Sequence, residues 1–338
     1  MKRLLATSAI ALGLATAAHA EGQLNLYVWA ESIAPELITA FEQEYDVKVN
    51  IDSFTSNEDM LTKLQAGASG YDLAMASQHF VRILIDEGLI QNFGANQLDA
   101  WANVSDQWKN QWWDETGEYA MPMSYGSASF VINRDEYDGP ADSLSYFFEP
   151  DEELAGRIAM LSYPDEVVGA AQLYLGVPFC TEDADEMKRV LDLLMAQKPA
   201  VAVYSSDNID SRLSSGEVAV HFWWDGETTR AQSEGANLEY VLPKEGVVGF
   251  LDSLVIPNNA PNYDNAVRFI EFISTPENAT IEQNFYAHGS AVATVEADLV
   301  FNRDNAPALY PDVPVVLSRT CSPAAQDLVT RVWTQLLQ

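Results

Sequence analysis

The hydrophobic positions of the chain alternate between the period of a strand and the period of a helix. Apolar side chains alternate with polar ones over 24–29, which is typical of a half-buried strand. Over 35–45, Leu37, Ile38 and Phe41 share one helical face. The same order continues with a strand over 47–54, a helix over 57–68, a short buried strand over 72–76 and a helix over 80–87. This βαβαβ order predicts a parallel sheet with helices on both faces.

The pattern changes near residue 120, where a longer strand over 124–133 follows an Ala-Met-Pro triplet. Such a strand is long enough to cross into a second domain. Further along, the pattern predicts a helix over 183–197, strands over 218–224 and 249–256, and a helix over 263–274. We find no internal repeat and no low-complexity linker. The sequence therefore predicts two α/β lobes, joined by crossing strands, with a ligand cleft between them.

The first twenty residues have the layout of a secretory signal peptide. Lys2 and Arg3 precede an uncharged apolar run over 4–18, and Ala18-His19-Ala20 forms a small-x-small cleavage site. A transmembrane anchor is the alternative, but the run is short for a membrane span and polar sequence follows at once. We therefore expect residues 1–20 to be removed, and the mature protein to be exported and soluble.

The composition adds a large negative charge to this picture. The 50 acidic and 18 basic residues give a net charge of −32. Loss of Lys2 and Arg3 with the signal peptide makes it −34. Such a surface repels nucleic acid and anionic lipid and attracts cations. Solubility, or adaptation to a salty medium, accounts for most of these charges, so the composition permits a cationic ligand without requiring one. The 8 Trp and 14 Tyr suit an aromatic-lined cleft.

Catalytic and metal-binding motifs are absent from the sequence. It contains no H-E-x-x-H, C-x-x-C, G-x-S-x-G, P-loop or G-x-G-x-x-G pattern. His79, His221 and His288 stand alone, and isolated histidines are more often packed or exposed than metal ligands. A carboxylate pair resembling that of a glycosidase arises by chance in so acidic a chain. We therefore predict a protein that is not an enzyme and that carries no metal or cofactor.

One carboxylate stands out because of its setting. Asp252 lies inside the apolar run 247–256, where an unpaired carboxylate would be costly. It needs a cation, a cluster of hydrogen-bond donors or a cap. A protonated amine is one such cation, since it demands carboxylate or carbonyl acceptors while its methylene chain and its charge both suit aromatic faces.

Several spaced segments together resemble one family. They are VWAE at 28–31, YDLAMAS at 71–77, AMP at 120–122, DEVV at 165–168, YLG at 174–176, WDGE at 224–227, LPKEG at 242–246 and FLD at 250–252. In this order and spacing, the chain resembles the periplasmic spermidine/putrescine-binding proteins of ABC importers over nearly its whole mature length. The resemblance implies a two-lobed periplasmic binding protein fold of type II-like topology. It also implies a monomer that binds a polyamine and delivers it to a membrane permease.

The resemblance also implies a division of the chain and a set of ligand-binding positions. Lobe 1 would comprise 21–125 plus 251–293, and lobe 2 would comprise 126–250 plus 294–338. The positions that match the family's ligand contacts are the aromatic residues Trp29, Trp224, Phe250 and Tyr286, the acidic residues Glu31, Glu166, Glu227 and Asp252, and Ser77. Alternatives stay open, because Trp29 and Trp224 also suit a core, and Glu31 and Glu227 also suit an acidic surface.

Departures from the family pattern concern selectivity and the two cysteines. Ser32, His79 and Tyr163 replace residue types that relatives carry at the cleft, so the preferred polyamine is open. Cys180 and Cys321 both fall in the second lobe by resemblance, which permits a disulfide in an oxidising compartment; two separate buried thiols are the alternative. Two other functions remain: a binding protein of the same fold for a sugar or another amine, and a hydrolase, which would need a nucleophile that no motif supplies.

Overall fold

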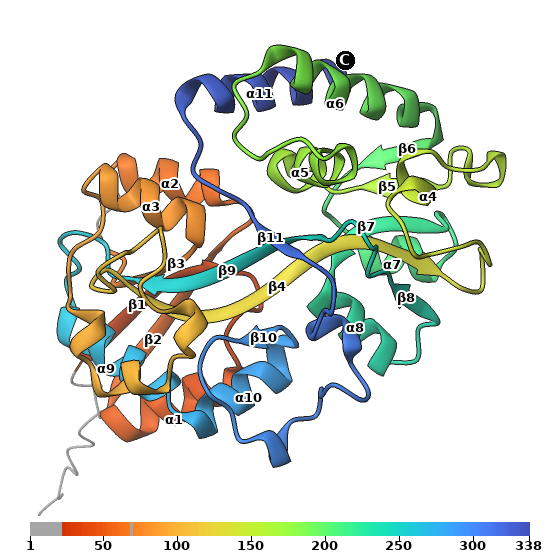
Figure 1. Ribbon diagram of the computed structural model, residues 1–338. Helices are drawn as coiled ribbons and strands as arrows, with labels where there is room; N and C mark the ends of the chain where they lie inside the picture. Colours follow the sequence, from red (N-terminus) through yellow and green to blue (C-terminus); the bar gives the residue numbers. More distant parts are fainter. Residues whose placement is uncertain (1–21, 68–69) are drawn as a thin grey trace, which may run out of the picture.

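The computed structural model describes residues 22–67 and 70–338 (Figure 1). The first elements are β1 (Gly22–Trp29), α1 (Pro35–Tyr45), β2 (Val47–Phe54), α2 (Asn57–Gln65), β3 (Leu73–Ser77) and α3 (Gln78–Asp86). β1 pairs in parallel with both β2 and β3, which confirms the predicted βαβαβ unit. Helix α2 ends at Gln65, before the predicted end at residue 68. Residue 68 and the expected signal peptide lie outside the described residues.

Two long strands run through the centre of the molecule and connect its halves (Figure 1). They are β4 (Ala120–Asn133) and β9 (Val247–Val255), which pair with each other in antiparallel fashion. β9 also pairs with β3, and β4 pairs with β7 (Val220–Trp224). One sheet with the order β2-β1-β3-β9-β4-β7-β5-β6 results. β4 begins at Ala120, whereas the predicted strand began at residue 124. Pro122 does not prevent the earlier start, because it stands where the pairing register with β9 shifts and a proline is tolerated at such an irregularity.

The crossing strands separate two bodies that each have their own layers. We call the body around β1, β2 and β3 lobe 1. Helices α2 and α3 cover one side of its sheet, and α1, α9 (Tyr263–Ile273) and α10 (Pro276–Tyr286) lie on the other (Figure 1). Apolar side chains of successive β1 residues point to opposite faces. Leu26 therefore packs with Phe41 and Phe269, whereas Tyr27 packs with Met60 and Leu84.

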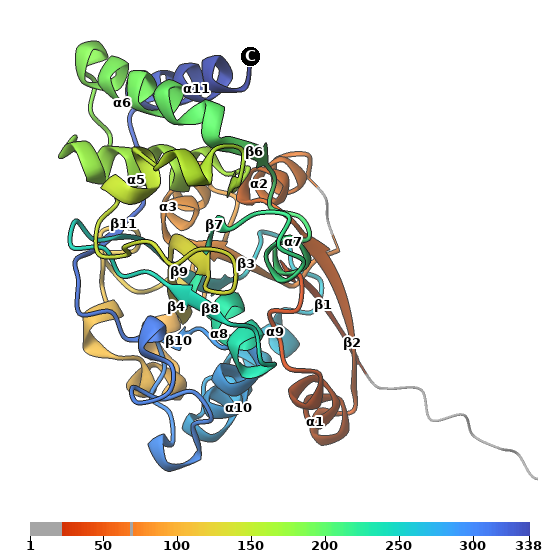
Figure 2. The same cartoon turned by 90° about the vertical axis from the view of Figure 1, so that its right-hand side faces the viewer.

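We call the second body lobe 2, which is built around β5 (Ile158–Met160), β6 (Val201–Tyr204) and β7. Helices α5 (Pro164–Leu175), α6 (Ala184–Gln197) and α11 (Pro323–Leu337) pack together on one side of its strands, and α7 (Ile209–Ser214) and α8 (Asp225–Ser233) lie on the other (Figure 2). A single buried cluster that includes Phe130, Met160, Phe222 and Leu336 holds the lobe together. The short elements α4 (Ser145–Phe148) and β8 (Leu238–Tyr240) complete it.

The end of the chain passes between the lobes again. After α10, β10 (Gly289–Ser290) pairs with β4, and β11 (Val315–Leu317) pairs in parallel with β9 before α11 joins lobe 2. A disulfide joins Cys180, between α5 and α6, to Cys321, just before α11. Over the described ranges, every helix is too short or too polar to cross a membrane.

Candidate ligand-binding site

A cavity of about 250 Å³ lies between the lobes, next to the crossing strands. Its walls contain eight of the nine positions that the resemblance indicated: Trp29, Ser77, Glu166, Trp224, Glu227, Phe250, Asp252 and Tyr286. Glu31, the ninth, is exposed two residues after the end of β1, in a turn where its φ is 56°, and it does not line the cavity. The divergent residues His79 and Tyr163 also line the cavity. Ser32 does not, since its hydroxyl donates to the Trp29 carbonyl at 2.8 Å.

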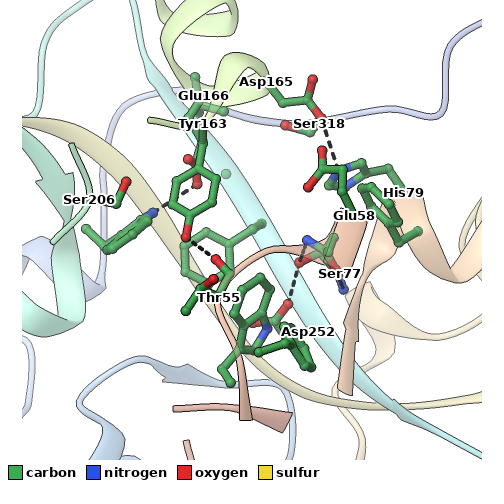
Figure 3. A pocket seen from close by; sticks show the side chains of 18 of the residues that line it. Thr55, Glu58, Ser77, His79, Tyr163, Asp165, Glu166, Ser206, Asp252 and Ser318 are labelled. Carbon is green, nitrogen blue, oxygen red and sulfur yellow. Dashed lines mark hydrogen bonds and ion pairs between the residues drawn. The ribbon is translucent and has the colours of Figure 1, made fainter. Parts of the chain in front are cut away.

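The secondary structure explains why these residues meet. Trp29, Ser77 and Trp224 are the last residues of β1, β3 and β7, so they stand at the carboxyl ends of strands, where ligands commonly bind in open α/β sheets. Phe250 and Asp252 lie on the crossing strand β9, two residues apart and therefore on one face. Glu166 lies in the first turn of α5. Figure 3 shows Glu166 and Asp252 on different sides of the cavity.

Asp252 is a buried carboxylate with a prepared hydrogen-bond partner. Its side chain is only 3% exposed, and its Oδ1 accepts a hydrogen bond from the Ser77 hydroxyl at 2.7 Å (Figure 3). The Asn57 amide in turn donates to the Ser77 hydroxyl at 3.0 Å. Burial raises the pKa of Asp252, and the Ser77 hydrogen bond opposes that rise. The Trp29 indole N–H favours the ionised form, although it makes no hydrogen bond of normal geometry.

Glu166 has fewer partners than Asp252. Its Oε1 accepts a hydrogen bond from the Trp224 indole N–H at 2.9 Å, while its buried Oε2 has no hydrogen-bond partner among the residues that the structure describes. Burial raises the pKa of Glu166 to about 8, and the neighbouring charge of Asp165 contributes to the rise. A carboxyl with this pKa holds its proton at neutral pH until a cation replaces that proton.

His288 forms a third charged centre behind Phe250 and Tyr286. Its ring is 2% exposed, with Nδ1 2.9 Å from Asp225 Oδ1 and Nε2 3.5 Å from Glu227 Oε2. Burial alone would lower the pKa of His288, but the two carboxylates raise it to about 10. The same charge lowers the pKa of Glu227 against the effect of its own burial. His288 is therefore an imidazolium inside the cavity wall.

Aromatic rings form the remaining walls. Trp29 packs on Phe54 with ring centroids 4.4 Å apart, and Tyr163 packs on Trp224 at 5.7 Å. Phe250 and Tyr286 both pack edge-on against His288, at 5.4 and 4.4 Å. The cavity thus combines aromatic faces with buried carboxylates, a combination that suits a ligand with an apolar body and positive ends.

Two contacts join the lobes across the mouth of the cavity. The Tyr163 hydroxyl of lobe 2 donates to the Thr55 carbonyl of lobe 1, and His79 Nε2 lies 3.4 Å from Asp165 Oδ2 (Figure 3). The lobes are therefore closed over the cavity. Two of the divergent positions, His79 and Tyr163, supply one side of each contact.

Sequence analysis missed several residues at this site. Glu58, Asp165, Asp207 and His288 all line the cavity. His288 lies two residues after Tyr286 and was interpreted as an isolated histidine, because its carboxylate partners lie about sixty residues earlier in the chain. Asp165 precedes Glu166 in the matched DEVV segment, and this adjacency was the one available signal.

The fold and the cleft define a solute-binding protein of the two-lobed class. Residues 36–306 match the model of the bacterial extracellular solute-binding protein family, and the chain belongs to this family. The spermidine/putrescine-binding periplasmic protein of Escherichia coli is 31% identical over 93% of this chain and 91% of its own length. The putrescine-binding periplasmic protein PotF of the same organism is 28% identical over 98% of this chain and 96% of its own length.

Solved structures give the same result for the fold. A putative spermidine/putrescine ABC transporter protein from Listeria monocytogenes superposes with a TM-score of 0.85 and 26% identity, over 94% of this chain and 99% of that one. The Tp0655 lipoprotein of Treponema pallidum superposes with a TM-score of 0.80 and 26% identity, over 93% and 99% of the two chains. The predicted two-lobed periplasmic binding protein fold and the predicted family are thus confirmed.

Proposed function

We propose that this protein captures a polyamine of the putrescine/spermidine class and delivers it to an ABC importer. One observation carries the proposal: Glu166 and Asp252 face one aromatic cavity, and neither forms an ion pair with any residue that the structure describes. Two buried carboxylates without cations are costly unless the ligand supplies the charges. The names of the relatives, which include putrescine-binding and spermidine/putrescine-binding proteins, agree with a ligand of this kind.

Each lining residue has a role in this proposal. Glu166 and Asp252 each accept one ligand ammonium, and Ser77 holds Asp252 in place. Trp29, Trp224, Phe250 and Tyr286 contact the methylene chain, and Glu227 adds acceptor oxygens between them. Glu31 joins the site only if the turn after β1 rearranges. No step of this kind breaks or forms a covalent bond, so the protein binds its ligand without converting it.

We also propose the export route and the lobe boundaries that follow from this function. Residues 1–20 serve as a signal peptide, so that the mature monomer starts at Glu21 in the periplasm and meets an inner-membrane permease there. The boundaries are 21–125 plus 251–293 for lobe 1 and 126–250 plus 294–338 for lobe 2. Tyr125 pairs with Leu251 and Gly126 with Phe250, so the proposed boundaries fall at one place on the crossing strands. Intact mass of the exported protein tests the cleavage site.

A thermal-shift panel tests the ligand class. It compares putrescine, cadaverine, spermidine and spermine with sugars and neutral amino acids. A ligand at about one hundred times its dissociation constant adds roughly 2.7 kcal/mol of stability, a clear rise in melting temperature. We expect a rise with one or more of the amines and none with the sugars. A rise with a sugar alone would overturn the proposal and favour a neutral-ligand binding protein of the same fold.

A further inference from the structure

His288 occupies a slot that the surrounding backbone keeps open for it. A Cβ atom added at Gly226 would lie 2.5–2.8 Å from three atoms of the His288 ring, and one added at Gly126 would lie 2.8 Å from its Nδ1. Such distances are shorter than van der Waals contact, so a side chain at Gly226 would force the His288 ring to move. At Gly126 a side chain would also meet Phe250 and Asp225, at 2.6 and 2.7 Å. Ala287, with a φ of 61°, ends α10 and turns His288 back toward β4 and β9.

The surroundings of His288 favour its protonated form. Each of its ring nitrogens faces a carboxylate oxygen, Asp225 on one side and Glu227 on the other. A neutral imidazole has one N–H and would turn a lone pair toward one of these oxygens. The doubly protonated ring instead donates a hydrogen bond from Nδ1 to Asp225 and points its Nε2–H toward Glu227 Oε2, which lies 3.5 Å away and interacts with it through charge. Asp225 is further satisfied by the backbone N–H groups of Ser127 and Gly226, each at 2.8 Å.

A second cation completes the balance. Arg230 Nη2 lies 3.7 Å from Glu227 Oε1, and its Nη1 donates to the Tyr286 carbonyl at 2.9 Å. Two cations, His288 and Arg230, therefore stand against two anions, Asp225 and Glu227, so this group of four has no net charge. At the mouth, Asp165 is paired with His79, and Glu58 and Asp207 are exposed to water. Among the described residues that line the cavity, Glu166 and Asp252 remain as the two buried carboxyl groups without a cation.

We propose that His288 is a specificity-determining residue, because its positive charge cancels that of Glu227 and leaves the cavity suited to a ligand with two ammonium groups rather than three. This inference rests on the proposed function and narrows it to diamines. Glu227 then supplies acceptor oxygens without attracting a further charge. A triamine would bring its third ammonium close to a wall that is already neutral and carries an imidazolium.

The test compares two ligands of one chain length. Spermidine and 1,8-diaminooctane span the same number of chain atoms and differ in the central group, an ammonium in the first and a methylene in the second. Calorimetric titration gives the dissociation constant of each, and their ratio measures the effect of the central charge. We expect the wild type to bind the diamine at least as tightly as the triamine.

Variants move this ratio in opposite directions. His288→Gln removes a positive charge, so the affinity for spermidine relative to that for 1,8-diaminooctane should rise by at least about tenfold. Glu227→Gln removes a negative charge beside the same ring, so the ratio should shift toward the diamine. A purely structural role would lower the affinity for both ligands without this reversal. Lys188→Gln is the matched control, because it removes an exposed positive charge on α6, far from the cavity, and should change the ratio less than about twofold.

Four outcomes would overturn the inference. A wild type that binds no amine would overturn it together with the proposed function. A wild type that binds spermidine more tightly than 1,8-diaminooctane would overturn the inference alone. So would amine binding with an affinity ratio that neither variant changes, or a change of that ratio in the same direction in both variants. Circular dichroism shows whether His288→Gln folds. If it does not fold, Glu227→Gln is the deciding variant. A relative affinity for spermidine that is unchanged or higher in Glu227→Gln would then count against the proposal.

Discussion

The two buried carboxylates that face the cavity are supported in different ways. Asp252 lies on β9, in the middle of the sheet, and accepts a hydrogen bond from Ser77, which Asn57 holds in turn. Glu166 lies at the start of a helix. Within 22–67 and 70–338, the Trp224 indole is its one hydrogen-bond donor and its other oxygen is unpaired. The hydrogen bonds at Asp252 thus offset part of the cost of burying its charge before the ligand arrives, whereas the charge of Glu166 depends more on the ligand. One end of the site is preorganised and the other is completed by binding.

The largest effect should come from the preorganised end. Asp252→Asn keeps the shape of the side chain and removes its charge, which leaves a buried ammonium with poorer compensation. Losing one partner of such a pair costs roughly 2–5 kcal/mol, so the affinity for putrescine should fall at least about thirtyfold. Calorimetric titration measures it. Asp192→Asn, on the exposed surface of α6, is the control and should have little effect. Equal affinities for wild type and Asp252→Asn would contradict the proposal that Asp252 pairs with a ligand ammonium.

A second substitution tests the support of Asp252 without changing its charge. Ser77→Ala removes the hydroxyl that donates to Oδ1, so part of the binding energy must then stabilise the carboxylate. A hydrogen bond to a charged group contributes about 1.5 kcal/mol or more, and we expect roughly tenfold weaker putrescine binding. The loss should grow as pH falls, since the pKa of Asp252 rises further in the variant. A loss that is the same from pH 5 to pH 8 would show that Ser77 does not support the charge.

The raised pKa of Glu166 predicts that the affinity for the amine depends on pH. Because the pKa of free Glu166 is about 8, amine binding at pH 7 must expel a proton from this carboxyl. Affinity should therefore rise with pH, by about fivefold from pH 7 to pH 8, and level off above pH 8. Titrations in buffers of different ionisation enthalpy measure the released proton directly. Glu166→Gln should abolish the dependence, while an enthalpy that is the same in every buffer would contradict it.

The last effect concerns the stability of the free protein rather than its affinity for the ligand. Protonated Glu166 contributes stability that is fully present below its unfolded pKa near 4.5 and is lost as pH rises through about 8. Glu166→Gln removes the cost of burying this charge. That cost grows by about 1.4 kcal/mol per pH unit between the unfolded and the folded pKa, so at pH 8.5 the free energy of unfolding of the unliganded variant should exceed that of wild type by up to roughly 4 kcal/mol. Chemical denaturation at pH 5 and pH 8.5 measures the difference, which should fall below about 1 kcal/mol at pH 5. A less stable variant at pH 8.5 would mean that the ionised carboxylate is already compensated.

The same contrast separates what the sequence predicts from what it does not. Asp252 could be singled out because its neighbours along the chain are apolar, and local context is enough to indicate a costly charge. The elements with a strong hydrophobic period, such as β1, α1 and α9, were predicted nearly to the residue. Helix α8 was missed because its sequence, DGETTRAQS, has no apolar face. The partners of His288 were missed because tertiary folding, rather than sequence spacing, brings Asp225 and Glu227 to its ring.

The disulfide has a consequence for the order in which the chain can be completed. The bond between Cys180 and Cys321 closes a covalent ring with a sequence separation of 141 residues, and this ring contains β9 and β11, two of the strands that pass between the lobes. Cys180 emerges midway through synthesis, but its partner emerges only after the chain has returned to lobe 1 through β9 and left it again through β11. The ring can therefore close only when nearly the whole chain has been made, and it then contains α9 and α10 of lobe 1 between two residues that are bonded within lobe 2.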